Sequence, residues 1–129
     1  MGTYLSTPVT EKGVEEGEDL QCASPISWGV VDMQGWRKTM EDAHIVDTDV
    51  TPPSTFKNKA KVFCVFDGHG GAEVARFCQL YLVDVLVNQE HWKGENVDIG
   101  KSLADAFHGM DKLIDDPERR YIFQPRSYC

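Results

Sequence analysis

The stretch Val62-Phe63-Cys64-Val65-Phe66-Asp67-Gly68-His69-Gly70-Gly71 decides the fold of this chain. A β-branched and aromatic run of this length, bounded by glycine, predicts a strand buried on both faces. The residues from Ala72 to Gln89 have helical spacing, so the polar residues fall at a strand-to-helix junction. Such a junction suits chemistry, because a strand aims side chains rigidly and glycine lets a ligand approach the backbone. A tight turn with a solvated aspartate at its tip is the alternative.

The remaining elements follow from apolar patterns on either side of this stretch. Three strands and two helices are expected, which favours helices packed on an antiparallel sheet, an α+β fold. The strands are Ser27–Met33, Ala43–Asp47 and Lys61–Phe66, and the helices are Ala72–Gln89 and Ile99–Ile114. Turns or loops are expected at Gln34–Lys38, Asp49–Lys59 and Gln89–Asn96. Residues 1–24 are polar, acidic and without period, which predicts a flexible extension.

Length and composition narrow the class of protein. At 129 residues the chain suffices for one domain with a modest core. A net charge of −8 argues against nucleic-acid binding, which needs a basic surface. The 4 cysteines form no CxxC pair and no zinc-like spacing. With no signal peptide and no apolar run of membrane-spanning length, we expect a cytoplasmic protein, with a nuclear or peripheral membrane location as alternatives.

The first residues carry one targeting signal. Met1-Gly2-Thr3-Tyr4-Leu5-Ser6 matches the pattern for N-myristoylation of Gly2, and an unmodified N-terminus is the alternative. One acyl chain binds membranes only marginally. The acidic residues that follow would be repelled by anionic lipid, so any membrane association through Gly2 should be weak and reversible.

Polar residues beside the first two expected strands are candidates for phosphate and metal binding. Arg37 follows a Gly-Trp turn, and arginine matches phosphate oxygens bidentately. The alternative is a surface arginine stacked on Trp36. Glu41 and Asp42 precede the second strand, where neighbouring carboxylates can hold a hard cation directly or through its waters. Adjacent acids are also common on solvated surfaces.

The junction after the central strand adds a third group of candidates. Asp67 can ligate hard metal ions through both oxygens, and Gly68 can offer its carbonyl because no side chain blocks the approach. His69 can act as a general acid, since the pKa of histidine lies near neutrality. A capping aspartate and a turn histidine are the alternatives.

Together the three groups resemble one known family. Met33-Gln34-Gly35-Trp36-Arg37, Met40-Glu41-Asp42-Ala43-His44 and Phe66-Asp67-Gly68-His69-Gly70-Gly71 are similar to motifs of the metal-dependent protein phosphatases of the PP2C (PPM) type. Met1-Gly2-Thr3-Tyr4-Leu5-Ser6-Thr7-Pro8 looks like the start of animal and protist members. The resemblance covers roughly residues 1 to 114.

The resemblance implies a four-layer αββα sandwich, two antiparallel sheets flanked by helices, with two Mg²⁺ or Mn²⁺ ions at one end. Asp67 would bridge both ions and Gly68 would give its carbonyl to one of them. Glu41, with Asp42, would hold water in the outer shell. The implied activity is hydrolysis of phosphoserine and phosphothreonine in proteins by water that the two ions activate.

The resemblance also assigns the contacts with substrate. Arg37 would grip the phosphate of the phosphoprotein, and His69 would protonate the leaving serine or threonine oxygen. No covalent nucleophile is needed. The implied partners are phosphorylated proteins, and a monomer is expected.

The sequence departs from the family pattern in its second half. The only Asp-Gly pair is Asp67-Gly68, and no Asp is followed by Asn, so two further metal aspartates of the family are missing. We therefore expect residues 25–129 to be the N-terminal part of an incomplete phosphatase domain, following the extension of residues 1–24. Such a chain would be inactive alone. A non-catalytic module that binds phosphoproteins or competes with an intact relative is the alternative function, and a chain that does not fold is the third.

Overall fold

The computed structural model describes residues 4–21, 23–116 and 118. Along this part of the chain, strands come first and helices follow. The strands are β1 (Tyr4–Asp19), β2 (Ile26–Arg37), β3 (Ala43–Val50) and β4 (Ala60–Phe66), and the helices are α1 (Glu73–Val87), α2 (Glu90–Lys93) and α3 (Ile99–Asp115). The predicted α+β class is confirmed.

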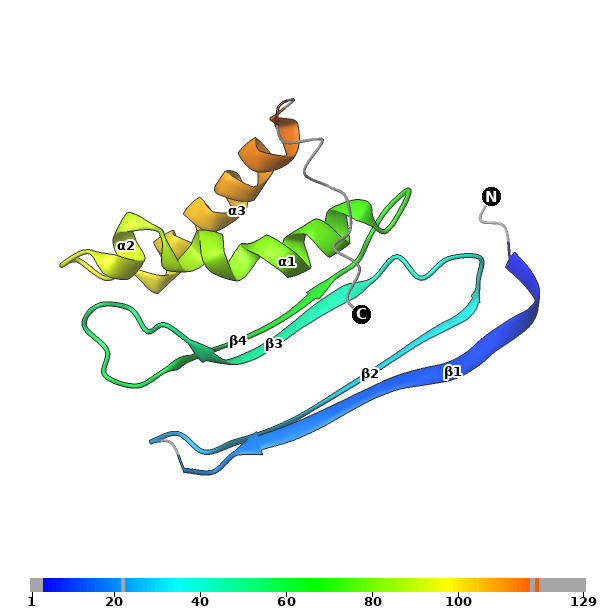
Figure 1. Cartoon of the computed structure of the whole chain (residues 1–129), viewed down its shortest axis with the longest axis horizontal. Helices are drawn as coiled ribbons and strands as arrows, with labels where there is room; N and C mark the ends of the chain where they lie inside the picture. Colours follow the sequence, from blue (N-terminus) through cyan, green and yellow to red (C-terminus); the bar gives the residue numbers. More distant parts are fainter. Residues whose placement is uncertain (1–3, 22, 117, 119–129) are drawn as a thin grey trace.

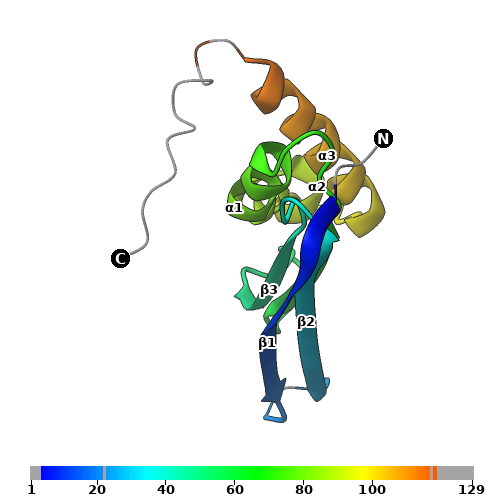
Figure 2. The same ribbon diagram turned by 90° about the vertical axis from the view of Figure 1, so that its right-hand side faces the viewer.

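The elements form layers of helix, sheet and sheet. β1 pairs with β2 and β3 pairs with β4, both antiparallel, in separate sheets of two strands. The helices cover one face of the β3–β4 sheet, and the β1–β2 sheet lies against its other face (Figure 1). The turned view in Figure 2 keeps the helices together on one side of the strands. This order corresponds to part of the expected αββα arrangement.

The core lies between the helices and the β3–β4 sheet. Leu82 and Leu86 of α1 are 2% and 1% exposed, and Ala106 and Met110 of α3 are 0% and 2% exposed. Both pairs have i, i+4 spacing, which puts each pair on one helix face. Burying a leucine side chain fully contributes about 1.5–3 kcal/mol, so this layer holds most of the apolar stabilisation.

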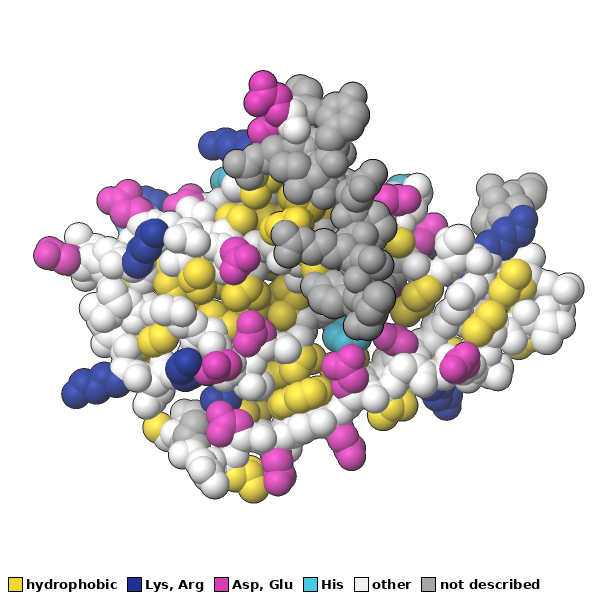
Figure 3. All heavy atoms as spheres, viewed as in Figure 1, with side chains coloured by type: hydrophobic (Ala, Val, Ile, Leu, Met, Phe, Trp, Pro, Cys, Tyr) yellow, Lys and Arg dark blue, Asp and Glu magenta, His cyan; other side chains and the backbone are white. Residues whose placement is uncertain are grey.

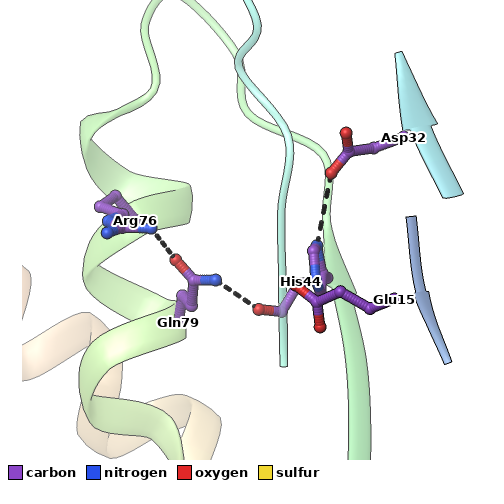
Figure 4. A network of polar contacts seen from close by, with 5 residues as sticks. All are labelled: Glu15, Asp32, His44, Arg76 and Gln79. Carbon is purple, nitrogen blue, oxygen red and sulfur yellow. Dashed lines mark hydrogen bonds and ion pairs between the residues drawn. The ribbon is translucent and has the colours of Figure 1, made fainter. Parts of the chain in front are cut away.

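Polar contacts join the β1–β2 sheet to the layer above it. The Nε2 atom of His44 lies 3.5 Å from a Glu15 carboxylate oxygen, and its Nδ1 atom lies 3.8 Å from an Asp32 oxygen. On the helix side, the Gln79 side chain donates to the His44 carbonyl at 2.5 Å (Figure 4). Lys61 on β4 forms an ion pair of 2.8 Å with Asp19 on β1. His44 therefore contacts both neighbouring layers.

The expectation of a flexible extension over residues 1–24 is wrong for residues 4–19, which form β1. Its regular ladder with β2 runs from the Lys12–Met33 pair to the Asp19–Ile26 pair. An added Cβ would lie 2.5 Å from Trp28 at Gly17 and 2.5 Å from Asp32 at Gly13. The glycines thus make room for larger side chains on β2, which removes the apolar alternation by which a strand is recognised.

The expectation that the central strand is buried on both faces is also wrong. On the side of β4 away from the helices, Phe63 is 41% exposed and Val65 is 79% exposed. Phe63 meets Trp28 of β2 with ring centroids 6.4 Å apart. Val65 pairs with His44, whose ring faces the carboxylates of the other sheet, so polar rather than apolar groups of the described residues lie over this end.

Two smaller expectations change as well. The predicted turn at Gln34–Lys38 is mostly strand, since β2 continues to Arg37 and bends at Gly35, whose φ is +66°. Only glycine adopts such a φ readily. The break at Gln89–Asn96 contains the short helix α2, which is anchored by the buried Trp92. Among the described residues, no helix is long and apolar enough to span a bilayer, and Gly2 lies outside those residues.

Candidate active site

The β3–β4 register brings two of the three polar groups to the same place. Ala43, the first residue of β3, pairs with Phe66, the last residue of β4. Glu41 and Asp42 come just before Ala43, and Asp67 and Gly68 come just after Phe66. Because the strands are antiparallel, both groups lie at one end of the sheet, where Figure 1 shows the two loops together.

Gly68 lies directly against the loop that carries Glu41. A Cβ at Gly68 would be 2.3 Å from the carbonyl oxygen of Glu41 and 2.9 Å from that of Gly71. No side chain fits at either distance. The glycine is therefore required so that the loop after β4 can pack on the loop before β3.

The Glu41 carboxylate accepts a hydrogen bond within its own loop and is influenced by the backbone amides of the loop after β4. Thr39 Oγ1 donates to Glu41 Oε1 at 2.9 Å. The Thr39 hydroxyl, the backbone N–H of Gly71, the nearby Arg37 charge and the backbone N–H of Gly70 lower the pKa of Glu41, and these effects outweigh desolvation. Hydrogen bonds to a carboxylate favour its charged form, so Glu41 is an anion at neutral pH.

Arg37 stands at the exposed end of β2, the strand that leads into the Glu41 loop. Its charge acts on the Glu41 carboxylate, which brings the first polar group into the same region as the other two. Among the described residues, the Arg37 side chain has no hydrogen-bond or ion-pair partner within the usual distances. Its donors are available to an added anion.

The other predicted site residues lie in the same loops with their side chains turned to solvent. Asp42, Asp67 and His69 are all exposed. Sequence position and register place Asp42 and Asp67 next to each other across the sheet end. His69 follows Gly68 by one residue and shares that loop.

The donors here suit a hard cation in kind but fall short in number. Carboxylate and carbonyl oxygens are the ligands that Mg²⁺ and Mn²⁺ prefer, and Asp67 and Gly68 offer both kinds. Within the part of the chain that the structure describes, no three His, Cys, Asp or Glu side chains are grouped closely enough to hold a metal ion. Asp67 and Gly68 can thus provide part of an octahedral shell, and other oxygens must complete it.

Sequence reasoning missed three residues that organise these loops. Thr39 and the amides of Gly70 and Gly71 bind the Glu41 carboxylate. A threonine two residues before a glutamate is a recognisable local hydrogen-bonding pattern, so Thr39 carried a signal. The two amides carried none, because their contact depends on the strand register.

With the fold and the loops defined, comparison with known proteins gives a class. The family model for protein phosphatase 2C matches residues 26–124. The α+β arrangement of the two sheets and the helices is consistent with the N-terminal part of that fold. The chain belongs to the protein phosphatase 2C family.

Individual relatives agree with this family. The chain is 43% identical over 114 residues to probable protein phosphatase 2C 21 of Arabidopsis thaliana, covering 88% of this chain and 29% of that protein. It is 38% identical over 117 residues to probable protein phosphatase 2C 5 of Paramecium tetraurelia, covering 91% and 36%. With probable protein phosphatase 2C 58 of Oryza sativa subsp. japonica it shares 42% over 114 residues, covering 88% and 28%. The chain spans about a third of the length of these relatives.

Proposed function

We propose that the domain to which these residues belong hydrolyses phosphoserine and phosphothreonine in proteins, with two Mg²⁺ or Mn²⁺ ions. Family membership supports protein phosphatase activity. Bound in pairs, such ions supply a water nucleophile at neutral pH and neutralise charge on the phosphoryl group. The substrates are phosphorylated proteins.

The metal-side roles fall to the loops at the end of the β3–β4 sheet. The Asp67 carboxylate and the Gly68 carbonyl oxygen would help to hold the ions. Gly68 has no side chain to block that oxygen, and its packing on Glu41 fixes the backbone. Glu41, an anion held by Thr39, and Asp42 beside it would accept hydrogen bonds from water around the ions.

The substrate-side roles fall to Arg37 and His69. Arg37 presents a planar fork of donors that matches two phosphate oxygens. His69, exposed in the loop after Gly68, would donate a proton to the serine or threonine oxygen as it leaves. Arg37 would carry the affinity for phosphate, and His69 would supply the proton to the leaving oxygen.

The observation that carries this proposal is the meeting of two segments, the one from Arg37 to Asp42 and the one from Asp67 to Gly71, at one end of the β3–β4 sheet. Glu41 and Gly68 are far apart in the sequence, yet Gly68 packs directly on the Glu41 carbonyl oxygen, and Arg37 lies four residues before Glu41. A solvated turn or an isolated surface arginine would not need that convergence.

The test uses the full-length protein that carries these residues and a phosphoserine peptide with Mn²⁺. Asp67→Asn should abolish phosphate release, because the neutral amide is a poor ligand for a hard cation. Asp49→Asn is the matched control, since Asp49 is an exposed aspartate paired with Lys59 on the same sheet. Equal turnover by the Asp67→Asn variant would refute the proposal.

A second function is favoured by the incomplete donor set. The described residues contain no group of three metal-ligating side chains, while Arg37 is exposed and available to an anion. The 129-residue chain by itself would then bind phosphoproteins without turnover, or compete with an intact relative. This function predicts phosphopeptide binding that is lost on Arg37→Ala and unaffected by EDTA; binding that needs metal would contradict it.

The proposal also includes myristoylation of Gly2 in the cell. A myristoyl group on Gly2 would give a cytoplasmic protein a weak and reversible hold on membranes. Mass spectrometry of the N-terminal peptide tests it, with Gly2→Ala as the control. An unmodified Gly2 in cells would remove the membrane-associated part of the proposal.

A further inference from the structure

The side chain of Gln34 forms hydrogen bonds with the backbone at Arg37 and Lys38. Gln34 Nε2 donates to the Arg37 carbonyl at 2.9 Å and to the Lys38 carbonyl at 3.0 Å. A primary amide has two N–H donors, and both are used here. Gly35, with φ of +66°, bends the strand so that the Gln34 side chain can reach residues three and four positions ahead.

These two hydrogen bonds lie where the pairing of β1 with β2 is irregular. Gly35 pairs with Val9 and Arg37 pairs with Tyr4, so the register shifts between these two pairs. The regular ladder begins only at the Lys12–Met33 pair. The pairing of β1 with the backbone around Arg37 is therefore irregular, and the Gln34 amide adds a local restraint there.

The position of this backbone sets where the Arg37 guanidinium can reach. The Arg37 side chain has no partner among the described residues at hydrogen-bond or ion-pair distance, so its own contacts do not hold it. A bidentate arginine–phosphate contact depends on geometry, and an ordered arginine loses less conformational entropy on binding. A residue that fixes the Arg37 backbone should strengthen phosphate binding without touching phosphate.

We propose that Gln34 is a positioning residue, which orders Arg37 for binding a phosphate group through its two backbone hydrogen bonds. The phosphate part rests on the function proposed above for Arg37. The ordering part rests only on the contacts of Gln34. Gln34→Leu removes the donors at similar volume, whereas Gln34→Lys keeps a donor that can reach carbonyl oxygens.

The experiment measures two quantities on the 129-residue chain. The first is the order of the Arg37 backbone N–H group by ¹⁵N relaxation, and the second is the affinity for a phosphoserine peptide. Gln34→Leu should lower the order of Arg37 and weaken peptide binding roughly fivefold, the effect of about one net hydrogen bond. Gln34→Lys should restore much of both.

A matched control separates positioning from general stability. Gln89 Nε2 donates to the Val85 carbonyl at 2.8 Å, so Gln89→Leu removes a similar contact far along the chain from Arg37. It should leave Arg37 order and peptide affinity unchanged. The inference is overturned if Gln34→Leu leaves Arg37 order unchanged, or if Gln89→Leu lowers it equally.

The two readouts keep this inference distinct from the proposed function. Wild-type chain and an Arg37→Ala variant that bind the peptide equally would refute phosphate binding by Arg37. The relaxation data would still decide whether Gln34 orders Arg37. If the order of Arg37 falls in Gln34→Leu and recovers in Gln34→Lys, the positioning role of Gln34 is supported. If the order of Arg37 does not change in Gln34→Leu, that role is refuted.

Discussion

The Glu41 carboxylate accepts a hydrogen bond from the Thr39 hydroxyl, its pKa is lowered further by the amides of Gly71 and Gly70, and its backbone carbonyl packs against Gly68. One residue thus connects the segment before β3 with the segment after β4. The side chain and the main chain of Glu41 make different contacts. The carboxylate accepts hydrogen bonds, and the backbone carbonyl limits the space beside Gly68. Substitutions at its neighbours should therefore have separable effects.

Gly68→Ala should destabilise the fold by about 1–3 kcal/mol, the usual cost of overpacking. Its Cβ would meet the Glu41 carbonyl at 2.3 Å, and that carbonyl belongs to a backbone that cannot rotate away. Urea unfolding of the chain measures the change in the free energy of unfolding. Gly29→Ala is the control, because its Cβ would meet only the Glu15 carbonyl, at 3.9 Å. Equal stability of the two variants would contradict the packing described here.

Thr39→Val should raise the pKa of Glu41 towards its ordinary value, because the Thr39 hydroxyl is the largest cause of its lowering. The lowered pKa means that Glu41 stabilises the fold above the ordinary carboxyl pKa. This stabilisation is lost as the pH falls through the folded pKa. Carbon-detected NMR titration of the Glu41 carboxyl measures the shift. Thr10→Val, on β1, should leave the titration in place, and an unchanged pKa in Thr39→Val would count against the hydrogen bond.

At the residue scale, the sequence predicted which residues lie together at the site but not the hydrogen bonds that fix their positions. Asp67, Gly68 and Glu41 stand beside apolar runs, so their place at strand ends could be predicted. The roles of Gln34 and Thr39 depend on where one side-chain atom falls, within a few tenths of an ångström of a carbonyl or carboxylate oxygen. Apolar spacing carries no information at that precision.

Among the elements, α3 depends on a side-chain cap at its start. Asp98 is the N-cap, and its carboxylate accepts a hydrogen bond from the Lys101 N–H at 2.9 Å. Asp98→Ala should cost about 1 kcal/mol, while Asp98→Asn, which can still accept, should cost only a few tenths. Thermal or urea unfolding distinguishes the two variants. If both lose the same stability, the cap does not contribute as described.

Whether residues Tyr4–Asp19 form the strand β1 can be tested directly. Its ladder with β2 predicts slow amide exchange at alternate positions between Lys12 and Asp19, where N–H groups are hydrogen-bonded. Hydrogen exchange followed by NMR measures the rates, with the loop of residues 51–59 as an internal reference. If the amide hydrogens of β1 exchange as fast as those of that loop, the strand is not stable and the prediction of a flexible extension is correct after all.

The elements that could be predicted are those with an apolar period. α1 and α3 were foreseen because apolar residues recur in them at helical spacing, although the predicted α3 stripe included Leu103 and Phe107, which are 38% and 53% exposed beside the buried face of Ala106 and Met110. β1 could not be foreseen, because Gly13 and Gly17 stand where a strand would usually show apolar residues. β2 was cut short in the prediction because Gly35 reads as a turn, whereas the strand bends there and continues.

On the scale of the molecule, the apolar content is divided unevenly between the layers. The helix-side core is well buried, whereas Val65 between the sheets and Val14 and Val31 on the outer sheet are 79%, 64% and 64% exposed. Figure 3 shows hydrophobic side chains reaching the surface between the layers, with acidic side chains scattered around them. The acidic excess, a net charge of −8, opposes association through these apolar surfaces.

The proposed activity is also a property of the molecule as a whole, because it needs two segments of the chain and further oxygen ligands for the metal ions. A site that offers Asp67 and the Gly68 carbonyl can hold an ion firmly only when other oxygens complete the shell. The chain spans about a third of its relatives' length. The decisive measurement therefore belongs to the full-length protein.

That measurement is phosphate release from a phosphoserine peptide as metal is removed and returned. Turnover by the full-length protein should stop in excess EDTA and recover when Mn²⁺ or Mg²⁺ exceeds the chelator. In the proposed mechanism the ions supply the water nucleophile. Full turnover in excess EDTA would contradict the account.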